Sequence, residues 1–144
     1  MRKLLLATTA VALSAGAVSA EDIKIGVIIG FTGPIESITP FMADGAEMAM
    51  SEVNAGGGIL AGTMVHGIRA DSACIDSAVA QASAERLVTS DNVVAIMGAD
   101  CSGVTRAVLE NVAMANGIPM ISPSATSPGF STFDSGGLFY RTAP

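Results

Sequence analysis

Basic and aromatic residues are scarce in this sequence, and tryptophan is absent. Of its 144 residues, seven are lysine or arginine, 13 are aspartate or glutamate, and 4% are aromatic. Apart from Arg2-Lys3, no two basic residues are adjacent. Proteins that bind nucleic acids use clustered lysines and arginines to neutralise phosphates, so we expect no nucleic-acid partner.

Motifs for nucleotide binding and for nucleophilic catalysis are also lacking. Gly98–Gly103 does not fit G-x-G-x-x-G, and no G-x-x-x-x-G-K-[ST] occurs. Ser102 lies in Cys-Ser-Gly instead of G-x-S-x-G, and the one histidine, His66, lies in a strand-like run where a structural or surface role is expected. There is no C-x-x-C pair. We therefore expect no metal site, no cofactor and no enzymatic activity.

The longest apolar run lies at the N-terminus. Arg2-Lys3 precede the apolar stretch Leu4–Ala17, and the small residues Val18-Ser19-Ala20 follow. This order is typical of a secretory signal peptide, here residues 1–20, cleaved after Ala20. The alternative, an N-terminal membrane anchor, requires a longer run. The mature chain, residues 21–144, has five basic and 13 acidic residues and a net charge of −8.

Only two cysteines, Cys74 and Cys101, are present. In an exported chain an even number of cysteines favours a disulfide, and two free thiols are the alternative. A bridge between them would stabilise the fold by roughly 3–4 kcal/mol in the chain-entropy model.

Short β-prone runs alternate with helical patterns along the mature chain. We expect strands at residues 23–29, 64–71, 93–97, 118–122 and 138–141. The order βαβαβαβ, with three crossover helices, predicts an α/β fold with a doubly wound parallel sheet. Three helices cannot easily cover both faces of four or five parallel strands, so we expect the chain to be the first part of a longer protein.

Capping residues mark the start of each expected helix. Thr39 followed by Pro40 predicts an N-cap with proline at the first helical position. Asp76 is expected to cap a helix over residues 77–90, and Ser102 or Gly103 is expected to cap the third helix.

Three loops at the carboxyl ends of the expected strands carry hydroxyl groups and free backbone N–H groups. They are Thr32-Gly33, Ser102-Gly103 and Ser124-Ala125-Thr126. Ligands of open parallel sheets bind at this edge, and a helix N-terminus there favours an anionic group such as a carboxylate. Hydroxyl and carbonyl oxygens can accept hydrogen bonds from an ammonium group. We interpret the loops as half of a site for a zwitterion; ordinary capping and turn formation is the alternative.

Four segments occur in the order and spacing of a known family. They are Phe31-Thr32-Gly33-Pro34, residues 54–59, residues 71–74 with 98–103, and residues 121–128. Together they resemble the leucine/isoleucine/valine-binding family of periplasmic substrate-binding proteins, which serve ABC importers and share the type I periplasmic binding fold. Residues 140–144 resemble the family's run into its first crossing between lobes.

The resemblance implies a periplasmic solute-binding component of an ABC importer, with an inner-membrane permease as its partner. Its ligand would be a branched-chain amino acid or a similar small carboxylate or amide, held between two lobes. Residues 21–144 would form the incomplete N-terminal lobe, and the C-terminal lobe would be missing.

The resemblance also implies roles for individual residues. Ser102 would bind the ligand carboxylate through its hydroxyl and backbone, and Ser124 and Thr126 would hold the carboxylate and the amino group. A disulfide would join Cys74 to Cys101. The remaining residues expected at the ligand site are Phe31, Thr32, Gly103 and Ala125.

Two other functions fit the same pattern. One is the ligand-sensing ectodomain of a receptor with this fold, which a membrane-spanning helix further along the chain would identify. The other is a flavodoxin-like enzyme, which the absorbance of a bound flavin or nucleotide would identify.

Overall fold

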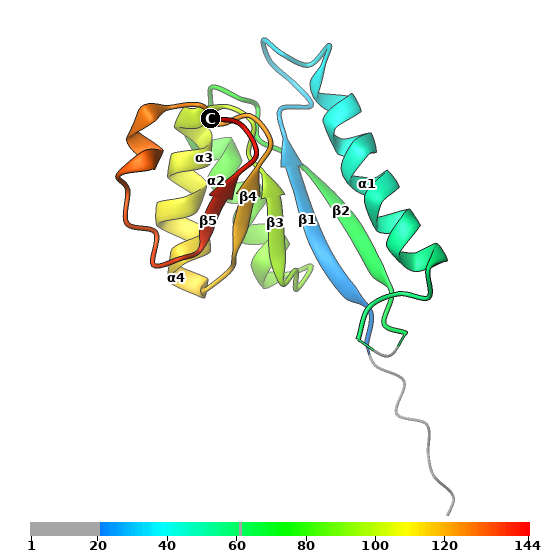
Figure 1. Ribbon diagram of the computed structural model, residues 1–144. Coiled ribbons are helices and arrows are strands. Elements are labelled where there is room, and N and C mark those ends of the chain that lie inside the picture. Colours follow the sequence, from blue (N-terminus) through cyan, green and yellow to red (C-terminus); the bar gives the residue numbers. More distant parts are fainter. Residues whose placement is uncertain (1–20, 61) are drawn as a thin grey trace, which may run out of the picture.

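The computed structural model describes residues 21–60 and 62–144 (Figure 1). The expected signal peptide lies outside the described residues. The elements, in chain order, are β1 (Ile23–Ile29), α1 (Thr39–Ala55), β2 (Val65–Asp71), α2 (Ser77–Thr89), β3 (Ala95–Gly98), α3 (Ser102–Val108), the π-helical turn η1 (Leu109–Ala113), α4 (Met114–Asn116), β4 (Met120–Ser122), the 3-10 turn η2 (Pro128–Ser131) and β5 (Phe139–Arg141). The segments α3, η1 and α4 follow one another without a break and form one long helix.

The five strands form a single parallel sheet in the order β2-β1-β3-β4-β5. This confirms the predicted α/β class and the doubly wound parallel sheet. The chain moves outward from β1 to β2, crosses back to β3, and continues in the other direction to β5. The strand order therefore reverses between β1 and β3, and the carboxyl ends of these strands border the position where doubly wound folds bind ligands.

Helices cover the two faces of the sheet unequally. The larger core lies under α2 and the long helix, and contains the fully buried Ile28, Leu87, Val108 and Leu109. The smaller core lies under α1, where Val27, Ile29 and Ala43 pack together. Figure 1 shows α1 at the β1–β2 end of the sheet, with no helix in front of β3, β4 and β5.

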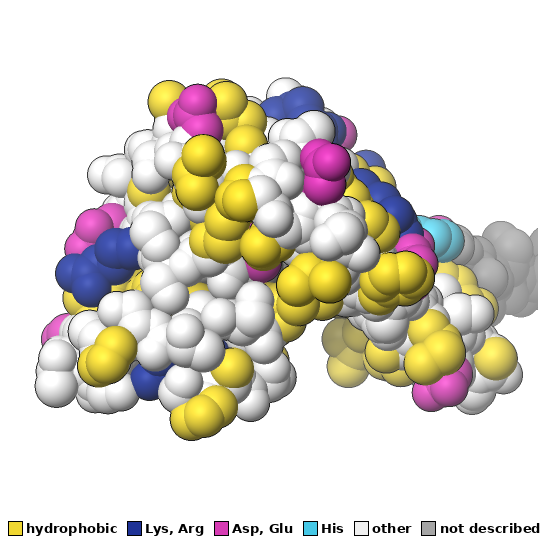
Figure 2. All heavy atoms as spheres, turned by 90° about the horizontal axis from the view of Figure 1, so that it is seen from above, with side chains coloured by type: hydrophobic (Ala, Val, Ile, Leu, Met, Phe, Trp, Pro, Cys, Tyr) yellow, Lys and Arg dark blue, Asp and Glu magenta, His cyan; other side chains and the backbone are white. Residues whose placement is uncertain are grey.

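The uncovered face forms an apolar groove of about 480 Å³ between α1 and β5. Met50 and Val53 line it from the helix, and Met97, Ile121 and Tyr140 line it from the sheet. Figure 2 shows the molecule hollowed on this side, with hydrophobic side chains around the hollow. Three helices thus leave part of one face exposed within the described chain, as the sequence predicted.

Two of the three predicted N-caps are wrong, because both helices begin at least one residue earlier than predicted. Thr39 is the first residue of α1 and Ile38 is its N-cap, because the Thr39 hydroxyl is buried and donates to the carbonyl of Gly30 at 2.6 Å. Cys101 is the N-cap of α3, so Ser102 and Gly103, the two predicted alternatives, both lie within the helix. Asp76 is confirmed, since its carboxylate accepts the N–H groups of two residues in the first turn of α2.

Strand boundaries differ slightly from the predicted ones. β3 begins at Ala95 instead of residue 93, and β4 begins at Met120 instead of residue 118. Pro119 precedes β4 and has no N–H to donate, although its carbonyl accepts from Ile96. No helix among residues 21–60 and 62–144 is both long enough and apolar enough to cross a bilayer.

Candidate ligand site

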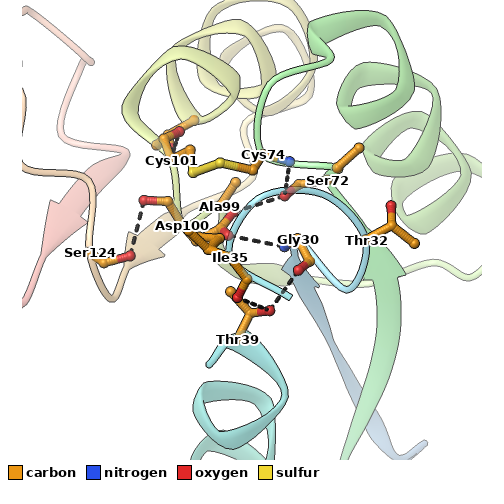
Figure 3. The surroundings of a disulfide bond; sticks show 12 residues. Gly30, Thr32, Ile35, Thr39, Ser72, Cys74, Ala99, Asp100, Cys101 and Ser124 are labelled. Carbon is orange, nitrogen blue, oxygen red and sulfur yellow. Dashed lines mark hydrogen bonds between the residues drawn. A yellow bond between two sulfur atoms is a disulfide. The ribbon is translucent and has the colours of Figure 1, made fainter. Parts of the chain in front are cut away.

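A disulfide joins the loops that follow β2 and β3 (Figure 3). The sulfur atoms of Cys74 and Cys101 are 2.01 Å apart, and the two Cα atoms are 5.2 Å apart. Asp100 lies beside this pair, within 4.8 Å of the two sulfurs. Because both sulfurs are bonded to each other, they are not available as thiolate ligands for a metal ion.

The carboxylate of Asp100 connects the loops after three strands. It is 2% exposed, and it accepts the backbone N–H of Gly30 at 3.1 Å and the hydroxyl of Ser72 at 2.8 Å. The backbone carbonyl of Asp100 accepts the hydroxyl of Ser124 at 3.0 Å, which adds the loop after β4 (Figure 3). The sequence interpretation missed this residue, although an acidic side chain directly after a buried strand was visible in it.

Ser102 lies at the start of α3, next to the loop after β4. Its Oγ accepts the backbone N–H of Ser127 at 3.1 Å, and the hydroxyl proton remains able to donate. The N–H groups of Ser102 and Gly103 belong to the first helical turn and have no acceptor four residues earlier within the helix. The start of α3 thus offers several donors at the predicted edge of the sheet.

The hydroxyl of Ser122, the last residue of β4, anchors the loop that follows this strand. This buried hydroxyl donates to the carbonyl of Ala99 at 2.5 Å and accepts the N–H of Ala125 at 3.0 Å. Ala125 is fully buried, whereas Thr126 is exposed. Within the part of the chain that the structure describes, the N–H and the hydroxyl of Thr126 have no hydrogen-bond partner. Thr126 therefore presents the unengaged donors of this loop.

Phe31 and Thr32 belong to a different cluster of contacts. The Thr32 hydroxyl donates to the carboxylate of Asp71 at 2.5 Å, and the Phe31 ring lies 5.4 Å from the guanidinium of Arg69. In Figure 3, Thr32 lies on the opposite side of the disulfide from Ser124. The structure therefore brings Ser102, Gly103 and the loop after β4 together. Phe31 and Thr32 lie along the same edge of the sheet, but the described contacts include no hydrogen bond from either residue to Ser102, Gly103 or the loop after β4.

The carboxylate of Asp71, which accepts the Thr32 hydroxyl, has a lowered pKa. Burial alone would raise its pKa, but hydrogen bonds from the Thr32 side chain and from the backbone N–H groups of Ala73, Thr32 and Phe31 outweigh burial and lower it. Each of these donors favours the ionised form.

We expect Asp71→Asn to lower the free energy of unfolding at pH 7 by about 1 kcal/mol, because the amide loses charge-assisted hydrogen bonds. A lowered pKa stabilises the fold above the unfolded value of about 3.9, and this contribution is lost as the pH falls through the folded value. Urea unfolding of both proteins should therefore show a gap at neutral pH that closes below about pH 4. Glu85→Gln, on the exposed side of α2, is the control; an equal gap at all pH values would contradict the role of Asp71.

Comparisons with known proteins place these observations in context. A family model described as "Periplasmic binding protein" matches residues 22–143. The leucine-specific-binding protein of Salmonella typhimurium is 34% identical over 127 residues, which cover 88% of this chain and 33% of that protein. The Leu/Ile/Val-binding protein of Escherichia coli is 36% identical over 109 residues, which cover 76% and 29%. The chain thus spans about a third of the length of these curated relatives.

Solved structures of substrate-binding proteins are also similar to this chain in fold. The substrate-binding protein LivJ from Streptococcus pneumoniae, in complex with isoleucine, superposes with a TM-score of 0.73 at 32% identity, covering 83% of this chain and 33% of that one. An ABC transporter substrate-binding protein from Desulfitobacterium hafniense, in complex with leucine, gives a TM-score of 0.69 at 26% identity, covering 85% and 34%.

Proposed function

The chain belongs to the family of periplasmic binding proteins, and we propose that it forms most of the first lobe of a solute-binding component of an ABC importer. The ligand we propose is a branched-chain amino acid or a similar small carboxylate. The observation that carries the proposal is the meeting of unengaged donors from Ser102, Gly103 and Thr126 at the carboxyl edge of the sheet. Relatives whose names specify leucine, isoleucine or valine support this ligand class.

The contacts divide the predicted site residues by role. We assign the ligand carboxylate to the hydroxyl of Ser102, the N–H of Gly103 and the N–H and hydroxyl of Thr126, since neutral donors can hold an anion at such an edge. We assign the ligand ammonium to the backbone carbonyl of Ser124, whose hydroxyl is engaged by Asp100. In this proposal Ala125 supports the loop from beneath, and Phe31 and Thr32 border the site.

We propose binding without catalysis. The one histidine of the sequence, His66, is in β2, and its ring nitrogen lies 3.1 Å from the carboxylate of Asp22. Asp22 directly precedes β1, so this pair lies at the amino end of the sheet, opposite the candidate site. Ser102 therefore has no histidine to act as its base.

We further propose that the ligand is enclosed by a second lobe, and that the mature protein works in the periplasm after export. The uncovered apolar groove over β3–β5 and the coverage of about a third of each relative both support a larger folded unit. A parallel sheet is normally covered on both faces, so additional chain packed in the groove would complete this lobe. Closure of two lobes around a ligand would then follow the hinge motion of periplasmic binding proteins.

Calorimetric titration with leucine tests the proposed ligand contact. The protein to titrate is a hybrid in which residues 21–144 are joined to the remaining two thirds of the leucine-specific-binding relative. We refer to this hybrid as the two-lobed protein. We expect Ser102→Ala to weaken binding by about 1–3 kcal/mol, the range for a hydrogen bond to a charged group. Ser51→Ala is the matched control. Ser51 is exposed near the C-terminal end of α1, so this change should leave the affinity unchanged. Equal affinity of the Ser102→Ala and unsubstituted proteins would contradict the proposed contact.

A further inference from the structure

Arg141 makes an unusual set of contacts at the edge of the candidate site. It lies in β5, opposite Ser122 of β4 in the register of the sheet. Its Nη1 donates to the carbonyls of Ala125 at 3.2 Å and Ser127 at 3.0 Å, and its Nη2 donates to the Ser131 hydroxyl at 2.7 Å. Among residues 21–60 and 62–144, no carboxylate lies within ion-pairing distance of it.

All three acceptors belong to one segment, Ala125–Ser131, which contains Thr126. The planar guanidinium can hold several acceptors at once in a fixed geometry, which a lysine ammonium cannot do. Hydrogen bonds from a charged donor to buried carbonyls are also stronger than those between neutral groups. The half-buried arginine thus donates all three of these hydrogen bonds to one segment, and it forms no ion pair within the described chain.

We propose that Arg141 is a positioning residue for ligand binding, which acts through the Ala125–Thr126 peptide. This inference rests on the proposed function. The peptide is trans, so its C=O and N–H point in opposite directions. Because Arg141 binds the carbonyl of Ala125, the N–H of Thr126 is directed away from Arg141 and held there.

The hydrogen bond from Arg141 also makes the N–H of Thr126 a stronger donor. A cation at the carbonyl oxygen polarises the peptide group and makes its N–H a better donor to an anion. On the far side of Thr126, the N–H of Ser127 donates to the Oγ of Ser102. Thr126 is therefore held between two anchors, Arg141 and Ser102, and its own donors remain unengaged.

The rest of the loop has a separate anchor, which makes the role of Arg141 testable. Thr142 donates its N–H to the carbonyl of Ser122 at 3.0 Å and its hydroxyl to the carbonyl of Pro123 at 3.2 Å. If the two bonds from Thr142 alone fixed the loop, removal of the Arg141 guanidinium would leave the segment after Pro123 as well protected from exchange as before. If Arg141 fixes it, the loss should be confined to Ala125–Ser131.

Amide hydrogen exchange of the 144-residue chain, followed by NMR, separates these outcomes. In Arg141→Met we expect the amides of Ser127, Gly129 and Phe130, all hydrogen-bonded within or next to the loop, to exchange at least about tenfold faster, since opening of the loop exposes them. Amides of β1 should keep their rates. The matched control is Arg86→Met, which removes an arginine bonded to Asp91 and to the carbonyl of Arg69 at the end of α2. Unchanged loop exchange in Arg141→Met would overturn the proposal.

Arg141→Lys covers the case in which Arg141→Met loosens the whole fold. Lysine keeps the charge but cannot hold three acceptors in one plane, so we expect faster exchange in the loop alone. Loop exchange equal to that of the unsubstituted chain would show that charge suffices, and would also overturn the proposal.

Titration of the two-lobed protein with leucine tests the consequence for binding. We expect Arg141→Met to weaken leucine binding at least about tenfold, Arg141→Lys to weaken it less, and Arg86→Met to leave it unchanged. A loosened loop with undiminished leucine affinity would overturn the positioning role. If the unsubstituted two-lobed protein did not bind leucine while the loop loosened as expected, leucine would be refuted as the ligand, and the hold of Arg141 on the loop would be supported.

Discussion

Replacement of Gly98 by alanine is expected to prevent stable folding of the chain. Gly98 is the last residue of β3 and pairs with Ile28 of β1 in the centre of the sheet. A Cβ built on Gly98 would lie 1.9 Å from the carbonyl oxygen of Ile28 and 2.8 Å from its Cγ2, and the φ angle of Gly98 is +130°. Relief of this overlap requires β1 and β3 to separate, because the obstructing atom belongs to the backbone.

The expected destabilisation exceeds about 4–5 kcal/mol, which approaches the whole stability of a small domain. Circular dichroism and urea unfolding should show a chain that lacks a cooperative transition. Gly45→Ala is the matched control: it lies within α1, and an added Cβ meets no atom within 4 Å. This change should raise stability by about 0.5–1 kcal/mol, because alanine favours a helix interior over glycine. A Gly98→Ala chain with an unchanged unfolding midpoint would contradict the close approach of β1 and β3.

The class of fold could be predicted because its periodicities are local. The apolar run of β1 and the spacing of Val104, Val108 and Val112 on the long helix can be read from neighbouring residues alone. The alternation of strands and helices then leaves few topologies, since crossovers between parallel strands are right-handed. The uncovered face also followed from counting helices against strands.

The details that the sequence did not reveal depend on partners far along the chain. The hydroxyl of Thr39 looked like a helix cap, but it donates to the carbonyl of Gly30 nine residues earlier. Asp100 binds the N–H of Gly30 across 70 residues, and Arg141 binds Ala125 across 16. A local pattern gives the type of each polar residue, whereas the fold decides which donor or acceptor comes within reach.

The candidate site shows the same division. The sequence placed Ser102 and the loop 124–126 at one edge, and the structure brings them together through the bond between Ser127 and Ser102. Thr32 lies at that edge too, but Asp71 takes its hydroxyl, because a hydrogen bond to a carboxylate is stronger than one to a neutral acceptor. Which hydroxyls stay unengaged thus depends on where the nearest carboxylates lie after folding.

Removal of the disulfide is the second change for which we expect a large effect. The bond between Cys74 and Cys101 closes a loop of 27 residues in sequence separation. In the chain-entropy model, loss of such a crosslink lowers the free energy of unfolding by roughly 3–4 kcal/mol, because the unfolded chain regains conformational freedom. Urea unfolding of the double variant Cys74→Ala/Cys101→Ala should show this decrease, and the unsubstituted chain in reductant should unfold at a similar urea concentration.

The position of the disulfide makes this measurement informative about the site. The loops after β2 and β3 are also joined by the bond between Ser72 and the buried carboxylate of Asp100. If the variant loses less than about 1 kcal/mol, the disulfide adds little to that bond and the entropic account is wrong. If it loses the expected amount, Ser72→Ala in the variant should destabilise it further, because Asp100 would lose its remaining link to the loop after β2. The crosslink and the buried carboxylate would then together hold the edge of the sheet at which Ser102 lies.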